Sequence, residues 1–184
     1  MRHIEDFQEN PQIGAVVLRV NSPGGSALAS DEVWAAIEFL RETKPVVVSM
    51  GAYAASGGYY ISMPADWIYA QPGTVTGSIG IFAGKLATTD LLDRIGVSQW
   101  SSSRGPLAGM FHSTDPFTEA ERAKLRERIE SFYATFVTKA AHKIVEAGGS
   151  LRDVQQLAGH TSLATTQRYI EGNNDAKRKV IQMI

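Results

Sequence analysis

The residue best suited to chemistry in this sequence is Ser56, within the glycine- and alanine-rich stretch Gly51–Ser62. This stretch follows the apolar run Pro45–Met50, which predicts a buried strand. A strand that breaks at glycine and restarts as a helix exposes a hydroxyl at a sharp corner, near the positive end of the helix. We therefore predict that Ser56 is a nucleophile, although small residues here would also suit a helix packed tightly against a sheet.

A second glycine corner, Asn21–Gly25, favours the catalytic interpretation. It follows the apolar run Ala15–Val20, and continuous apolar runs of this kind are typical of parallel strands. Between the two runs, apolar residues recur at helical spacing from about residue 26 to 43. The strand, helix and strand together predict a right-handed parallel crossover that ends at the Ser56 corner.

The rest of the chain predicts short elements and one long helix. We expect a helix that ends near residue 10, strands at 67–70 and 76–82, helices at 86–95 and 118–146, a polar loop at 100–109, and a new helix from residue 150. The glycines of 76–82 suggest close approach to another segment or to a ligand. The long helix starts with capping-box spacing, and its apolar stripe is typical of a core or subunit contact: Leu125, Ile129, Phe132 and Phe136.

The composition limits the possible functions. The 184 residues suffice for one domain with a core and a short appendage, and the formal net charge of −1 predicts no strong attraction to nucleic acid. Cysteine is absent, which excludes disulfides, thiolate catalysis and thiolate metal sites. We expect no metal and no cofactor. No apolar run is long enough to span a membrane, so the chain as written is expected to be soluble, with its compartment open.

Four stretches, in this order, resemble the C-terminal catalytic repeat of the signal peptide peptidase A family: residues 17–25, 44–51, 54–62 and 76–82. The resemblance covers about residues 13–136. It implies an α/β fold of the ClpP/crotonase type, with layered sheet and helices, and Ser/Lys endoproteolysis of cleaved signal peptides. It also implies that Ser56 attacks the peptide carbonyl, that backbone N–H groups of Gly25 and Gly57 form the oxyanion hole, and that the chain forms membrane-associated homo-oligomers.

The general base that the resemblance implies is a buried, neutral lysine, and it is missing from its expected place. In short relatives this base lies in the loop before the long helix, where this chain has Ala108. In long relatives it comes from an N-terminal repeat that this chain lacks. Lys85 is the nearest remaining lysine in the motif region, although the family pattern does not give it this role. His112 is a Ser/His alternative without an evident carboxylate partner.

The C-terminal stretch has a different resemblance. Residues 150–170 are similar to the end of a tyrosine recombinase, or phage integrase, in which His160 would contact the scissile phosphate and Tyr169 would be the nucleophile. The arginines and lysine that this chemistry needs are absent, so we expect no DNA cleavage and only weak phosphate contact by the basic residues 177–179. We accordingly predict two parts, a peptidase-like domain at 1–140 and an integrase-like helical tail at 141–184.

The resulting hypothesis is a serine endopeptidase whose base comes from an absent repeat or from another subunit. The competing hypothesis is a catalytically inactive chimeric fragment that acts as an interaction module, with residual DNA contact through the tail as a further alternative.

Overall fold

The computed structural model describes residues 2–162 and 164–167. In chain order its elements are α1 (Arg2–Glu9), β1 (Val16–Ser22), α2 (Ala27–Arg41), β2 (Val46–Ala55), α3 (Gly57–Ser62), β3 (Trp67–Tyr69), β4 (Val75–Gly77), α4 (Thr89–Arg94), α5 (Glu119–Glu146) and α6 (Leu151–Leu157). The chain therefore has a mixed α/β fold, as the sequence predicts.

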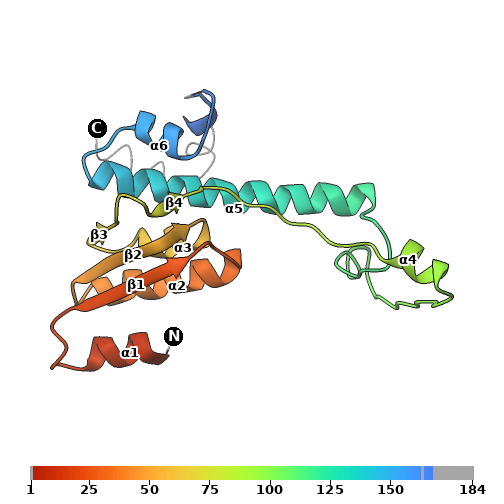
Figure 1. Ribbon diagram of the computed structural model, residues 1–184, viewed down its shortest axis with the longest axis horizontal. Helices are drawn as coiled ribbons and strands as arrows, with labels where there is room; N and C mark the ends of the chain where they lie inside the picture. Colours follow the sequence, from red (N-terminus) through yellow and green to blue (C-terminus); the bar gives the residue numbers. More distant parts are fainter. Residues whose placement is uncertain (1, 163, 168–184) are drawn as a thin grey trace. The chain divides into compact units, whose positions relative to one another are not determined.

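The strands form one parallel sheet with β2 at its centre (Figure 1). β1 pairs with β2 from Val16 opposite Val46, so the predicted parallel strand–helix–strand unit is confirmed. β3 pairs with the first half of β2, and β4 pairs with its last three residues, Tyr53–Ala55. Just before Ser56, β2 therefore pairs with β4 instead of β3.

Two predicted strand boundaries are wrong. β2 does not break at Gly51 but continues to Ala55, because β4 supplies pairing partners for Tyr53–Ala55. Gly51 instead allows close packing, since a Cβ there would lie 2.7 Å from Asn21 Oδ1. The predicted strand 76–82 is also shorter and ends at Gly77, where the backbone turns to φ 76° and leaves the extended conformation.

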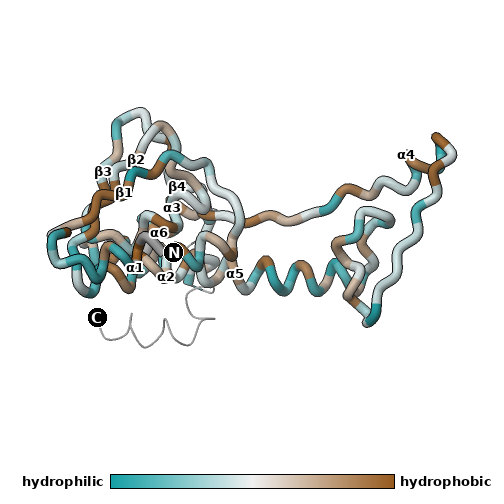
Figure 2. The backbone as a smooth tube through the Cα atoms, turned by 90° about the horizontal axis from the view of Figure 1, so that it is seen from below, coloured by the Kyte–Doolittle hydropathy of each residue, from teal (hydrophilic) through white to brown (hydrophobic). Residues whose placement is uncertain are grey.

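Helices cover one face of the sheet (Figures 1 and 2), and this is where the core lies. The predicted apolar stripe of α5 contributes Phe132 and Phe136, whose rings lie 5.7 and 4.8 Å from that of Tyr60 in α3. Tyr60 and Phe136 are almost fully buried. The predicted capping box at the start of α5 is also present, since Thr118 N–H donates to the Glu121 carboxylate at 2.8 Å. The prediction that this part of the stripe is core is therefore confirmed.

The opposite face of the sheet carries exposed apolar side chains. Val17, Val47 and Trp67 form one row across the three strands β1, β2 and β3, and Val17 and Trp67 are 68% and 55% exposed. Tyr69 is also exposed on β3. Parallel sheets are generally covered on both faces. Within the described part of the chain, these side chains remain open to solvent.

The chain divides into two compact units. The described residues up to Ile81 and those from Phe132 onward form the first unit, and Phe82–Ser131 form the second. The sequence suggests a domain boundary at residue 140, but α5 is continuous there. The boundary therefore stays a proposal about where the two parts of the sequence came from. Among the described helices, none is long and apolar enough to cross a membrane.

Candidate active site

Ser56 lies at the strained turn between β2 and α3. Its backbone has φ 50° and ψ −119°, a conformation that residues with a side chain rarely adopt and that costs about 1–3 kcal/mol. Two backbone hydrogen bonds hold this turn: Ser56 N–H donates to the Gly77 carbonyl at 2.8 Å, and Tyr60 N–H donates to the Ser56 carbonyl at 2.8 Å. The Ser56 side chain is half-buried and does not cap α3. Its hydroxyl is therefore presented at the corner rather than used to close the helix.

The Asn21–Gly25 corner packs directly against Ser56. Gly24 has φ 120°, and a Cβ there would lie 2.8 Å from Ser56 Cβ and 3.2 Å from Ser56 Oγ. The Ser22 hydroxyl accepts a hydrogen bond from Gly24 N–H at 3.2 Å and so shapes this turn. A Cβ at Gly58 would overlap the Ser22 carbonyl oxygen. The two glycine corners recognised in the sequence are therefore in contact, and glycine is what permits the approach.

The backbone N–H groups of Gly25 and Gly57 lie beside the same corner. The position that a Cβ would take on Gly57 is 3.3 Å from Gly25 N. Gly57 opens α3, where an N–H has no acceptor within its helix. In the described part of the chain, Gly25 N–H also donates to no backbone acceptor. Two donors next to a serine hydroxyl could stabilise an oxyanion, and such a donor typically contributes about 10²–10³ in rate.

A charged network fixes α3, and hence Ser56, to α2 and α5. The Tyr60 hydroxyl and Lys139 Nζ both donate to Asp31 Oδ1, at 2.5 and 2.6 Å. Lys139 Nζ also lies 3.4 Å from the centroid of the Trp34 ring. Burial alone would raise the pKa of Asp31, but the hydrogen bonds from Lys139 and Tyr60 lower it overall. Burial, reinforced by Asp31, raises the pKa of Tyr60.

The sequence reasoning missed this network. Its members are far apart in the chain, and each alone has the pattern of an ordinary helical residue. The nearest signal was the stripe of α5, which predicts contact with the core but identifies no charged partner.

Each lysine described in the first unit already has a hydrogen-bond partner. Lys139 is paired with Asp31, and Lys44 Nζ donates to the carbonyls of Asn10 and Ile13 at 2.6 and 2.7 Å. Lys143 donates to the carbonyl of Ala65, and burial lowers its pKa. Among its described residues, the first unit therefore has no lysine that lacks a hydrogen-bond partner and could serve Ser56 as a base.

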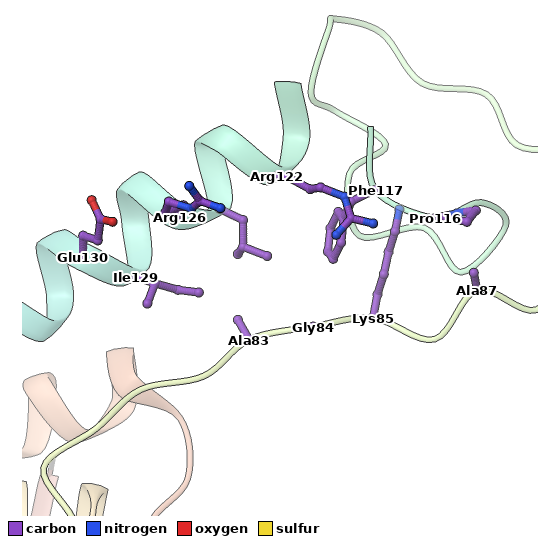
Figure 3. A pocket seen from close by; sticks show the side chains of 11 residues that line it. Ala83, Gly84, Lys85, Ala87, Pro116, Phe117, Arg122, Arg126, Ile129 and Glu130 are labelled. Carbon is purple, nitrogen blue, oxygen red and sulfur yellow. The ribbon is translucent and has the colours of Figure 1, made fainter. Parts of the chain in front are cut away.

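The other base candidates, Lys85 and His112, belong to the second unit, as does Ala108, which stands where the resemblance places the lysine. Lys85 Nζ lies 4.5 Å from the centroid of the Phe117 ring. Its side chain borders a groove of about 600 Å³ that also includes Arg122 and Arg126 of α5 (Figure 3). Lys85 therefore has an aromatic partner of its own, and its role as a base stays a prediction.

His160 makes contacts within the fold. Its Nε2 and the Tyr133 hydroxyl are joined by a hydrogen bond of 2.5 Å, and its Nδ1 lies 2.7 Å from the fully buried Thr166 hydroxyl. Burial lowers the pKa of the imidazole. Both ring nitrogens are thus engaged in linking the C-terminal segment to α5. Tyr169 and residues 177–179 lie outside the described residues.

Comparison with known proteins gives a consistent result. Residues 38–167 match the family model described as Peptidase family S49. Over 139 residues, or 75% of its length, the chain is 40% identical to "Serine protease SPPA, chloroplastic" of Arabidopsis thaliana and 45% identical to "Protease 4" of Salmonella typhi. It is 39% identical to "Protease 4" of Haemophilus influenzae over 84% of its length. These matches cover only 20%, 22% and 24% of the three relatives.

Proposed function

The chain belongs to peptidase family S49, and we propose that it hydrolyses peptide bonds through Ser56. The observation that carries this proposal is the strained Ser56 turn packed against the Gly24–Gly25 corner. This arrangement combines a half-buried hydroxyl with backbone donors at the position where negative charge would develop.

In the proposed reaction, Ser56 Oγ attacks the carbonyl carbon of the substrate peptide and its proton passes to a base. The N–H groups of Gly25 and Gly57 stabilise the oxyanion of the tetrahedral intermediate. The base then returns the proton to the leaving amine, and water hydrolyses the resulting acyl-enzyme by the reverse sequence. The base is a lysine from outside the first unit, contributed by a repeat that these residues do not include or by another subunit. This assignment agrees with the engaged lysines of the first unit.

We further propose cleaved signal peptides as substrates, a ClpP/crotonase-like layering for the complete catalytic domain, and a membrane-associated homo-oligomer as the working form. All three follow from the resemblance of the motifs. The chain spans only about a fifth to a quarter of the length of the three relatives named above, so their remaining parts would complete the site.

Covalent labelling with a fluorophosphonate probe tests the proposal. Where another subunit of the same chain supplies the base, wild type is expected to label, and Ser56→Ala is expected not to. Ser78→Ala is a matched control, because Ser78 is also a serine at positive φ (51°) but has no nucleophilic role in the proposal. Peptidase activity or labelling that survives in Ser56→Ala would contradict the assignment.

A catalytically inactive interaction module is the competing proposal. The observation in its favour is that no lysine described in the first unit is available to Ser56. Absence of labelling in a folded sample of wild type, judged by circular dichroism, would support the inactive form and count against the peptidase.

We also propose that residues 141–184 derive from the end of a tyrosine recombinase. The match to the peptidase family extends to residue 167, and α5 is continuous through the proposed junction, so the part of this segment up to residue 167 lies within the matched region whatever its origin. Residual DNA contact would appear as a mobility shift of duplex DNA at low salt. The contacts of His160 with Tyr133 and Thr166 count against any catalytic role in DNA cleavage.

A further inference from the structure

The segment around α6 is bound firmly to the peptidase unit. Val154 of α6 is fully buried and belongs to the same core cluster as Phe136 of α5. Beyond α6, His160 bridges Tyr133 of α5 and the buried Thr166. α6 therefore has a defined position relative to α5, set by apolar burial and by hydrogen bonds.

This position places Leu157, the last residue of α6, against Gly77 at the end of β4. A Cβ on Gly77 would lie 2.9 Å from Leu157 Cδ2, so the leucine side chain occupies the space beside the glycine. The backbone at this point is unusual, because Gly77 and Ser78 both have positive φ, at 76° and 51°. Leu157 thus contacts the chain where β4 turns out of the sheet.

The same residue of β4 holds the Ser56 backbone. Gly77 is the register partner of Ala55, and its carbonyl accepts the hydrogen bond from Ser56 N–H at 2.8 Å. The preceding residue of β4, Thr76, donates its hydroxyl to the Ala54 carbonyl at 2.8 Å. The strained φ of Ser56 therefore depends on the position of Gly77 at the end of β4. Leu157 is the residue of α6 that packs against Gly77.

We propose that Leu157 is a positioning residue for Ser56: it packs on Gly77 and thereby keeps the Gly77 carbonyl in place to hold the strained nucleophile turn. Its catalytic consequence rests on the proposed peptidase function, whereas its effect on the Ser56 backbone does not. A segment whose sequence resembles a DNA-processing protein would in this way support a peptidase site.

Residue-resolved amide exchange of the full chain tests the positional effect without any need for activity. In Leu157→Ala, the Ser56 amide is expected to exchange about tenfold faster than in wild type, because opening of the bond to Gly77 becomes easier. The Val48 amide in the centre of the sheet should be unaffected. Gln156→Ala, an exposed neighbour on α6, is the matched control and should behave as wild type. Leu157→Met should restore slow exchange, because it restores the packing volume.

The fluorophosphonate labelling rate tests the catalytic consequence. It is expected to fall severalfold in Leu157→Ala and to recover in Leu157→Met. Gly77→Ala should also label slowly, since an alanine is strained at φ 76° and its methyl group would also collide with Leu157. The double variant Gly77→Ala with Leu157→Ala should label faster than Gly77→Ala alone, because the collision is removed.

The outcomes are distinct. Equal Ser56 exchange in Leu157→Ala and Gln156→Ala would overturn the positioning role, and so would equal acceleration at Ser56 and Val48, which indicates global loosening. Faster exchange confined to the Ser56 turn would support the positioning role. If wild type then fails to label, the positioning role stands and the proposed peptidase function is the part that fails.

Discussion

The contact between Lys139 and Asp31 provides a test of how α3, the helix that follows Ser56, is held in place. We consider Lys139→Met, which removes the ammonium group but keeps an apolar chain of similar length. The substitution deletes the 2.6 Å ion pair with Asp31 and the 3.4 Å contact with the Trp34 ring. The Tyr60 hydroxyl can still donate to Asp31.

The expected loss of stability is about 1.5–2 kcal/mol at pH 7. A cation over an aromatic ring contributes about 1 kcal/mol when partly desolvated. The ion pair adds about 0.5–1 kcal/mol, a value kept low because the Asp31 side chain is 43% exposed and water screens the pair. The retained apolar stem limits any further loss from packing.

The pH dependence gives the sign of the effect. The folded-state pKa of Asp31 lies below its ordinary value of 3.8, so the unfolded chain takes up the proton first as the pH falls. The stabilisation by Asp31 is therefore fully present above about pH 5 and is lost as the pH falls from 3.8 through the lower folded pKa. The difference between wild type and Lys139→Met should shrink over this range.

Urea unfolding followed by circular dichroism measures both effects. Lys124→Met is a matched control, because Lys124 forms an exposed ion pair with Glu127 at 2.7 Å on the same helix. That variant should change stability by no more than about 0.5 kcal/mol. The reasoning is refuted if Lys139→Met and Lys124→Met are equally stable at pH 7, or if the deficit of Lys139→Met is unchanged at pH 3.

Three further predictions concern the glycine corner and the C-terminal segment. Gly58→Ala should cost at least about 3 kcal/mol in urea unfolding, since its Cβ would overlap a backbone oxygen, whereas Gly73→Ala, with open space around it, should be neutral within about 0.5 kcal/mol. Val154→Ala should cost about 2 kcal/mol because Val154 is fully buried, and Val17→Ala on the exposed sheet face should cost far less; equal costs would show that α6 is not docked. Burial lowers the pKa of His160 below its ordinary 6.5, so the unfolded state binds the proton first as the pH falls. The free energy of unfolding should therefore decrease as the pH drops below about 6.5. A His160→Asn variant with the same pH profile as wild type would contradict this.

Much of the fold could be predicted because its signals are local. The strands β1 and β2, the amphipathic α2, the capping box of α5 and the two glycine corners each depend on residues close together in the chain. The strand boundaries could not be predicted in the same way. Gly51 has the pattern of a strand break, yet pairing with β4 extends β2 to Ala55, and that partner lies about twenty residues further on.

For the candidate site too, local motifs could be predicted and contacts between distant segments could not. Sequence motifs alone identified Ser56, Gly25 and Gly57, and their catalytic roles remain predictions. They did not reveal that Gly24 packs against Ser56 so closely that a Cβ would lie 2.8 Å from Ser56 Cβ, or that the Gly77 carbonyl holds the Ser56 backbone. Both contacts join separate segments, so they depend on packing rather than on spacing in the chain.

The sequence by itself determined the family, the parallel strand pair and the serine at its corner, because short-range propensity and motif order carry that information. Only the tertiary structure decided that Asp31, Tyr60 and Lys139 form one network, and that α6 reaches the end of β4 through Leu157. It also decided that His160 bridges Tyr133 and Thr166. The physical reason is that burial and hydrogen bonding select among partners far apart in the chain, and the local pattern around each residue is compatible with many such partners.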